Sequence, residues 1–391
     1  MANIQALRRN SAARLNAPRG ALRTHGVVVS FPRGMHEDPD SHEAMTRSGL
    51  ARRLAALKGY EYAGDFNASG EYDCPVYVVP GDTLVGAQSA KALGINGADD
   101  FFGGVVPFHF VGTKTITHPL IEANAHAPEG WSGAFARGVR RAVLPGYSAF
   151  SLEDARQAGE RLLQSAAVRV KPALALGGRG QSVVSDAGAL AQALRDLDTG
   201  ELESCGVVLE QNLSDVTTFS VGQVCVGDLV ASYFGTQKLA TDHTGAEVYG
   251  GSDLTVVRGD FNALLALDTD DAMRLAVEQA RTYDAAARRC FTGFFASRRN
   301  YDIVRGRGPD GAMKSGVLEQ SWRIGGASGA EIAALEAFRA DPDLGAVRAE
   351  CTETYDEHPR LPRNARVTYS GRDAEIGYIT KYTTLAAHAD A

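Results

Sequence analysis

The chain has 391 residues, more than one hydrophobic core usually serves, so we expect two or three domains. Apolar residues make up 44% and charged residues 22% of it, which is typical of globular proteins and excludes a mostly disordered or fibrous chain. A formal net charge of -7 gives no basic field for nucleic acid, and no apolar run approaches the roughly 20 residues that cross a bilayer. We therefore expect no nucleic-acid partner and no membrane partner.

Cysteine usage and the N-terminal segment bear on where the protein resides. The five cysteines show no C-x-x-C spacing, and they are Cys74, Cys205, Cys225, Cys290 and Cys351. Scattered thiols indicate a reducing compartment rather than a disulfide framework or a zinc site, so we expect a cytoplasmic protein. Residues 1–25 carry five arginines and no acidic residue, which resembles an organellar transit peptide, but we favour a basic flexible tail.

The region from residue 26 to residue 145 predicts a small α/β domain. Strands are predicted at residues 26–31, 75–79 and 105–111. Helices are predicted at residues 41–58, in a short segment ending at residue 93, and at residues 131–143. Ser41 has the chemistry of an N-cap and Gly59 that of a C-cap for the first helix. The strand–helix–strand order argues for a parallel sheet.

Further along the chain, short strands and helices alternate. The capping box S-L-E-D at residues 151–154 begins a helix with an apolar stripe. Strands are predicted at residues 168–171, 182–184, 207–209, 219–226, 229–234, 301–304 and 317–319. Helices are predicted at residues 187–197 and 270–290, and the second has acidic residues in its first turn and basic residues in its last. The last 60 residues predict two short helices and a strand pair at residues 366–369 and 375–382.

A lysine and a glycine-rich loop form the first candidate site. Lys171 ends a strand, and the loop that follows contains Gly177, Gly178 and Gly180. Glycines let backbone N–H groups approach phosphate oxygens, and a lysine adds a point charge to the same anion. The lysine precedes the glycines, so this is not a Walker A loop. The alternative is a glycine-rich hairpin loop that binds no ligand.

The segment V-V-L-E-Q-N-L at residues 207–213 is the second candidate. An acidic residue leaving a strand can accept a hydrogen bond from an adenine amino group, and Glu210 has that position. The backbone just beyond it can pair with the edge of the ring. The alternative is that Glu210 is a solvated carboxylate at the end of a strand.

Two carboxylates on neighbouring strands form the third candidate. If the strands are adjacent, Asp302, Glu319 and Ser321 face one cavity, because side chains alternate with a period of two. Two nearby carboxylates suit Mg²⁺, which takes few protein oxygens together with nucleotide phosphates. The alternative is that both acids pair with arginines, such as Arg305 and Arg323.

The order and spacing of these motifs over about residues 145–330 resemble the ATP-grasp superfamily of carboxylate–amine ligases. The resemblance implies an α/β chain of the α+β ATP-grasp kind, with a Rossmann-like N-terminal domain followed by two α+β subdomains that clasp ATP. The implied divisions are a tail at residues 1–25, the N-terminal domain at 26–145, a lid subdomain at 146–213, a second subdomain at 214–330 and C-terminal helices with a strand pair at 331–391.

The resemblance also implies roles for individual residues. The ATP-binding set is Lys114, Lys171, Gly177, Gly178, Gly180, Glu210, Gln211, Asn212, Leu213 and Asp215. Within it, the backbone of residues 212 and 213 would pair with adenine. The metal set is Asp302, Glu319 and Ser321, and the catalytic set is Arg323 and Lys238. The sequence departs from the family at Ser321, where a metal-binding asparagine is usual, and at Thr218, which aligns with an acid near the ribose.

The implied activity is an ATP- and Mg²⁺-dependent ligase. It would activate a small carboxylate as an acyl phosphate and couple it to an amine. A homodimer is a possible assembly of such an enzyme. Catalysis of this kind is mainly positioning and charge neutralisation. Two alternatives stay open at this point: an ATP-grasp phosphotransferase, and a nucleotide-binding protein that has lost catalysis.

Overall fold

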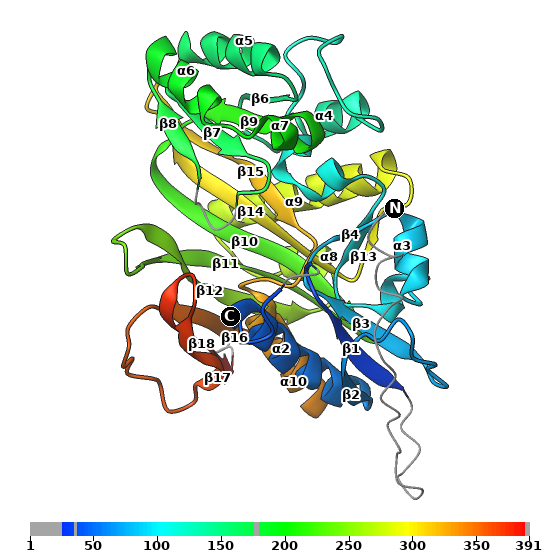
Figure 1. The fold of residues 1–391 in the computed structure, drawn as a ribbon. Coiled ribbons are helices and arrows are strands. Elements are labelled where there is room, and N and C mark those ends of the chain that lie inside the picture. The colour runs from blue at the N-terminus through cyan, green and yellow to red at the C-terminus, as the bar shows by residue number, and fades with distance from the viewer. Residues whose placement is uncertain (1–25, 35–36, 176–179, 388–391) are drawn as a thin grey trace, which may run out of the picture.

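The structure of the protein is a computed structural model, and it describes residues 26–34, 37–175 and 180–387 (Figure 1). The expected tail at residues 1–25, as well as Gly177 and Gly178, lies outside these described residues. Within the described ranges, no helix combines the length and the apolar character that a membrane span requires.

The N-terminal region contains a three-stranded parallel sheet in the order β2-β1-β3. Its strands are β1 (Val27–Phe31), β2 (Glu61–Asp65) and β3 (Val76–Pro80). Helix α2 (His42–Lys58) begins and ends as the sequence predicts, because the Ser41 side chain accepts from the Ala44 N–H and Gly59 adopts φ 68°. Strand β2 was not predicted, since this edge strand is short and alternates between exposed and half-buried residues.

The segment after this sheet is more irregular than the sequence predicts. A second small sheet joins β4 (Leu84–Val85), β5 (Gly104–Val106) and β13 (Phe295–Ala296). The expected strand at residues 105–111 ends at Val106, and two 3₁₀ turns follow, η3 (His109–Gly112) and η4 (Lys114–Thr117). The short helices of this region are η2 (Ala98–Asp100), α3 (Ala87–Ala92) and α4 (Gly133–Val139).

A four-stranded antiparallel sheet at one end of the molecule has the order β6-β9-β7-β8 (Figure 1). Its strands are β6 (Gly146–Ala149), β7 (Val168–Pro172), β8 (Ser182–Val184) and β9 (Val207–Gln211). The helices of this part are α5 (Leu152–Leu163), α6 (Ala187–Arg195) and α7 (Thr199–Cys205). Leu162, Leu190 and Leu202 from these helices share one buried cluster with Val170 and Leu209 of the sheet. The predicted start of α5 is confirmed, since the Ser151 side chain accepts from the Asp154 N–H as an N-cap.

An eight-stranded antiparallel sheet in the order β15-β14-β10-β11-β12-β16-β18-β17 forms the centre of the molecule (Figure 1). Its strands are β10 (Ser214–Val226), β11 (Leu229–Thr241), β12 (Glu247–Arg258), β14 (Arg298–Arg307), β15 (Met313–Ser321), β16 (Ala346–Thr354), β17 (Arg366–Asp373) and β18 (Gly377–Ala387). Helices α8 (Phe261–Leu265) and α9 (Asp271–Cys290) cover one face, where Val221 is buried. Helices α10 (Ser328–Ala340) and α2 cover the other, where Val224 is buried.

The C-terminal segment differs from the prediction of two short helices and a strand pair. It contains helix α10 and three strands, and β16 is the strand that the sequence does not reveal, because its side chains alternate between buried and partly exposed. These strands extend the sheet that begins at residue 214, so they build one layer with β10–β12. The division of the chain into domains at residues 145, 213 and 330 stays a prediction.

Candidate active site

A cavity of about 680 Å³ opens between the four-stranded sheet and the eight-stranded sheet and extends to α2. Its volume lies within the roughly 300–1,000 Å³ of typical small-molecule sites. Many of the residues that the sequence singles out line it, namely Lys171, Glu210, Gln211, Asn212, Leu213, Asp302, Glu319, Ser321 and Arg323. The folding of the chain thus brings together residues from strands β7, β9, β14 and β15, as expected for a site between two sheets.

Lys171 lies at the bottom of the cavity and is almost fully buried, with 2% of its side chain exposed. Its Nζ donates to Glu210 Oε1 at 3.0 Å and to the carbonyl of Leu318 at 3.2 Å. An ammonium group has three N–H donors, so one donor is left for a ligand oxygen. Lys171 is therefore tied to both sheets, because Glu210 lies on β9 and Leu318 on β15.

Glu210 has a different role from the adenine contact that its sequence position suggests. One carboxylate oxygen accepts from Lys171, and the other lies 3.1 Å from Nε2 of the fully buried His118. Burial acts to raise the pKa of Glu210, but Lys171 and His118 outweigh burial and hold the pKa at about 2. The Glu210 carboxylate is therefore a counterion inside the protein, and Gly146 permits this arrangement, because a Cβ there would lie 2.8 Å from the His118 ring.

Lys114 does not itself line the cavity, and the segment of the two 3₁₀ turns buries it to 3% exposure. Its Nζ lies 3.0 Å from Glu319 Oε2 and donates to the carbonyl of Ala175 at 2.5 Å, beside the glycine-rich loop. Burial would raise the pKa of Glu319, but Lys114 and Lys171 lower it overall. The two lysines therefore flank Glu319 with positive charge, at the base of the loop that the sequence assigns to phosphates.

A small apolar cluster lines the cavity beside Lys171. It consists of Leu144, Leu213 and Val304, with Leu318 packed against them, and all four line the cavity. Of these, only Leu213 is singled out by the sequence; the others come from strands or loops where an apolar residue carries no distinguishing signal. The N–H of Asn212 donates to the carbonyl of Ala167 at 2.9 Å, so this group is not available to adenine, contrary to the sequence-based expectation.

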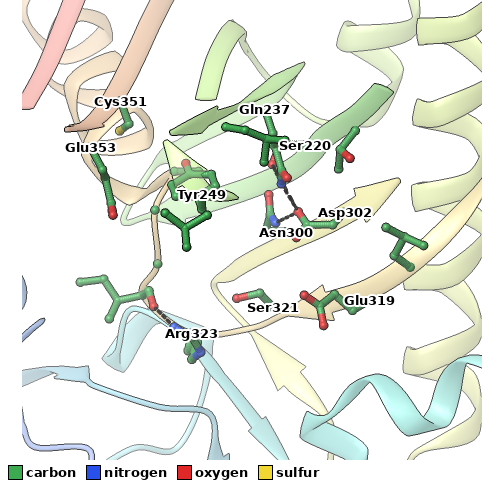
Figure 2. A pocket seen from close by; sticks show the side chains of 18 of the residues that line it. Ser220, Gln237, Tyr249, Asn300, Asp302, Glu319, Ser321, Arg323, Cys351 and Glu353 are labelled. Atoms are coloured by element: carbon green, nitrogen blue, oxygen red, sulfur yellow. Dashed lines mark hydrogen bonds between the residues drawn. The ribbon is translucent and has the colours of Figure 1, made fainter. Parts of the chain in front are cut away.

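Asp302 and Glu319 lie opposite each other on neighbouring strands β14 and β15, as Figure 2 shows. Asp302 Oδ1 accepts from Gln237 Nε2 at 2.7 Å, Asn300 Nδ2 at 2.9 Å and Ser220 Oγ at 3.4 Å. Burial, together with the facing Glu319, raises the pKa of Asp302 to about 6. Neutral donors, rather than the arginines of the alternative interpretation, therefore surround this carboxylate.

The paired carboxylates fit Mg²⁺ better than a metal held by protein alone. Among the described residues, no group of three or more His, Cys, Asp or Glu side chains is placed to hold a metal ion. Mg²⁺ needs only one or two carboxylates when phosphate oxygens and water complete its octahedron. Burial and repulsion by Glu319 raise the pKa of Asp302, and a cation between the two carboxylates would offset both effects.

Arg323 lies in the cavity beyond the carboxylates, with 25% of its side chain exposed (Figure 2). Its NH1 donates to the carbonyl of Ile324 at 2.9 Å, and its nearest carboxylate is Asp82, at 3.9 Å from Nε. A guanidinium with so few strong contacts can bind an oxyanion bidentately. Ser321 is engaged instead, because its Oγ accepts from Arg298 at 3.1 Å.

Lys238 and Asp215 are not part of this cavity. Lys238 forms an ion pair with Glu350 and points away from the face on which its neighbours Gln237 and Leu239 line the cavity. Asp215 is 77% exposed and lies 3.6 Å from Arg307, whereas Thr218 does line the cavity. Gly180 follows the loop with φ 69°, a conformation that suits glycine.

The end of the cavity farthest from Lys171 contains charged residues that the sequence did not single out. Glu353 of β16 and Lys381 of β18 form an ion pair at 3.0 Å, each with 14% of its side chain exposed. His42, the first residue of α2, lines the same end. Burial and the nearby Lys381 lower the pKa of His42. No local motif marks these three residues, because they meet only when β16 and β18 lie beside α2.

Comparison with solved structures identifies the fold. N5-carboxyaminoimidazole synthetase from Staphylococcus aureus, complexed with ADP, has a TM-score of 0.53 and 11% identity, over 94% of this chain and 95% of that one. Biotin carboxylase from Campylobacter jejuni has a TM-score of 0.49 and 12% identity, over 93% and 87% of the two chains. The fold is that of ATP-grasp enzymes, which confirms the fold class expected from the sequence.

Comparison with protein sequences gives the family. The search of curated proteins finds no match. The family described as "Protein of unknown function (DUF3182)" matches residues 30–383, which is most of the chain. The chain therefore belongs to this family and has the ATP-grasp fold.

Proposed function

We propose that the protein is an ATP- and Mg²⁺-dependent ligase that activates a small carboxylate as an acyl phosphate and couples it to an amine. The observation that carries this proposal is the meeting of the buried Lys171 with two facing carboxylates in one cavity, one of which also pairs with the buried Lys114. Lys114 and Lys171 supply positive charge on one side, and Asp302 and Glu319 face each other on the other. The ADP bound by the Staphylococcus aureus synthetase, which shares the fold, also supports a nucleotide in this cavity.

The nucleotide would occupy the end of the cavity formed by the two sheets. Adenine would lie between the apolar side chains of Leu144, Leu213, Val304 and Leu318. The phosphates would accept from the free donor of Lys171 and from Lys114, while Glu210 and His118 hold Lys171 in position. Asp302 and Glu319 would hold Mg²⁺, which neutralises phosphate charge when bound.

The substrates would occupy the other end, beyond Arg323. A carboxylate oxygen of the first substrate attacks the γ-phosphorus of ATP, and ADP leaves. Arg323 would hold the resulting acyl phosphate through its exposed N–H groups. The amine of the second substrate then attacks the acyl carbon, loses a proton and displaces inorganic phosphate. His42, whose lowered pKa keeps the imidazole neutral at pH 7, would accept that proton beside Glu353 and Lys381.

Hydroxylamine trapping tests the proposal without knowledge of the natural amine. The purified protein would be incubated with MgATP, a panel of carboxylates and hydroxylamine, and hydroxamate and phosphate would be measured. We expect hydroxamate to form in step with phosphate when the correct acid is present, because an acyl phosphate is intercepted by this nucleophile. Formation of ADP with a stable phosphorylated product, without hydroxamate, would instead identify a phosphotransferase.

Two variants sharpen this assay. Arg323→Met should lower turnover about 100-fold, while the KM for ATP changes much less, since its contact strengthens as charge moves onto the transferring oxygens. Lys238→Met is the matched control, because this lysine lies outside the cavity and should leave turnover unchanged. Equal losses in both variants, or a recovery of Arg323→Met at high Mg²⁺, would contradict the role of Arg323.

A further inference from the structure

A chain of buried hydrogen bonds runs behind Asp302 to helix α10. The Tyr233 hydroxyl lies 2.6 Å from Glu331 Oε1 and 2.9 Å from Asn300 Oδ1. The other end of the Asn300 amide, Nδ2, lies 2.9 Å from Asp302 Oδ1. Tyr233 and Glu331 are fully buried, and Figure 2 shows that Asn300 points toward Asp302 in the cavity. Asp302 in the proposed metal site is thus connected through Asn300 and Tyr233 to Glu331 of helix α10.

This series of hydrogen bonds has one hydrogen atom fewer than its acceptor contacts need. A tyrosine hydroxyl has a single proton, yet two acceptor oxygens face it, from Glu331 and from Asn300. Glu331 forms an ion pair with the buried Arg298, whose NH2 donates to it at 2.8 Å. Burial and Glu331 raise the pKa of Tyr233, so the phenol keeps its proton. The closer acceptor is the charged one, so the Tyr233 proton belongs to Glu331.

A half-turn of the Asn300 amide resolves the conflict. The turn exchanges its oxygen and nitrogen, which occupy nearly the same space. Nδ2 then donates to the Tyr233 oxygen, Tyr233 donates to Glu331, and every hydrogen has one acceptor. The turn brings Asn300 Oδ1 to the position about 2.9 Å from Asp302 Oδ1 that its nitrogen occupies now. Two oxygens at that distance repel each other unless a cation or a proton lies between them, and above the pKa of Asp302 a cation fills this role.

The separation, an ordinary hydrogen-bond length, also matches that of two neighbouring Mg²⁺ ligands. Oxygens at 2.0–2.1 Å from an octahedral ion lie about 2.9 Å apart at a right angle, by geometry. Ser321, at the position where the ATP-grasp resemblance places a metal-binding asparagine, already accepts from Arg298 at 3.1 Å. An amide ligand is therefore absent at position 321 and available at position 300, two residues before Asp302 on the same face of β14.

We infer that the side-chain oxygen of Asn300 is a third protein ligand of Mg²⁺, together with Asp302 and Glu319, and that Tyr233 and Glu331 orient it. This inference rests on the proposed metal site. In the metal-free protein Asn300 donates to Asp302, and the amide turns when the cation binds. Asn300 is then a metal ligand, whereas Tyr233 acts through Asn300 and is a positioning residue.

Mn²⁺ binding in the presence of ADP tests the inference, with free Mn²⁺ followed by electron paramagnetic resonance. We expect Asn300→Leu to weaken Mn²⁺ at least 10-fold and Asn300→Asp to bind it as tightly as the unaltered protein or more tightly, because a carboxylate oxygen can replace the amide oxygen. Tyr233→Phe should weaken Mn²⁺ several-fold, and Ser321→Ala should change it less than twofold. ADP binding without metal should be unchanged in Asn300→Leu, Tyr233→Phe and Ser321→Ala, which add no charge.

Two outcomes separate the inference from the metal site on which it rests. If Asp302→Asn abolishes Mn²⁺ binding but Asn300→Leu stays within twofold of the unaltered protein, Asn300 is not a ligand and the inference fails alone. If Asp302→Asn also leaves Mn²⁺ binding unchanged, the metal site and the inference fail together. Should Asn300→Leu not fold, Asn300→Asp decides, since loss of Mn²⁺ binding in that folded variant would overturn the assignment.

Discussion

Two regions of the cavity in which we propose that ATP binds enclose their carboxylates in opposite ways. Glu210 faces an ammonium and an imidazole, and its pKa is held at about 2. Asp302 faces amides, a hydroxyl and a second carboxylate, and its pKa is raised to about 6. The first carboxylate has its counterions within the protein. The second does not. This difference indicates a structural role for Glu210 and a cation-binding role for Asp302.

The neighbouring carboxylate Glu319 lies between these extremes. It pairs with Lys114 at 3.0 Å yet faces Asp302 across the strands. Its lowered pKa means that Glu319 is ionised without a metal ion. The carboxylate that lacks a positive partner is therefore Asp302. Variants at each of these positions should therefore differ in the sign as well as the size of their effect on stability.

The largest expected effect is that of Lys171→Ala. Removing one partner of a buried ion pair typically costs about 3–5 kcal/mol, and Glu210 would be left buried without its ammonium. Nucleotide binding should also be lost. Denaturant unfolding would measure the first effect and calorimetry the second. The double variant Lys171→Met, Glu210→Gln should regain much of the stability but none of the nucleotide affinity; if it regained neither, packing rather than charge would explain the loss.

The next effect is a loss of stability in acid. The folded pKa of Glu210 lies below its ordinary value of 4.5, so its stabilisation is complete above about pH 4.5 and is lost as the pH falls toward 2. The contribution is at most about 3 kcal/mol. We expect the free energy of unfolding of Glu210→Gln to fall less steeply over this range than that of the unaltered protein. Parallel curves would show that Glu210 is not held by Lys171 and His118.

The two metal-site carboxylates should respond with opposite signs in the metal-free protein at pH 7. Asp302→Asn removes an ionised group whose pKa is raised, so it should stabilise the protein by about 1–2 kcal/mol. Glu319→Gln leaves Lys114 without its carboxylate, so it should destabilise by a similar amount. Thermal unfolding with a chelator present measures both. If both variants lose stability equally, Asp302 is an ordinary structural acid.

The smallest expected effect is that of Lys238→Met. Its ion pair with Glu350 is partly exposed, and pairs of this kind contribute about 0–1 kcal/mol. Neither nucleotide affinity nor the pKa of Asp302 should change, which a titration of nucleotide at several pH values would check. A loss of nucleotide binding would mean that this lysine reaches the cavity in the bound state.

The sequence predicted the facing pair Asp302 and Glu319 better than the surroundings of Glu210, for a physical reason. Asp302 and Glu319 lie on sequence-adjacent strands, so strand pairing and alternation alone place them opposite each other. Glu210 depends on His118, which is 92 positions away and follows an irregular segment whose contacts no periodicity reveals.

Lys238 shows the limit of choosing residues by type. Side chains alternate along β11, so a shift of one position moves the side chain to the other face of the sheet. Gln237, its neighbour, is the residue that contacts Asp302. Glu353 and Lys381 were not predicted to line the cavity, because they lie on strands that alternate polar and apolar residues like any solvated strand.

Calorimetric titration with a non-hydrolysable ATP analogue tests the central proposal, that this cavity binds ATP with Mg²⁺, most directly. It would be done with and without Mg²⁺, on the unaltered protein and on Asp302→Asn. We expect the unaltered protein to bind the analogue at least 10-fold more tightly with Mg²⁺, and the variant to lose this difference while keeping its metal-free affinity. No binding at millimolar analogue, or the same Mg²⁺ dependence in both proteins, would contradict the proposal.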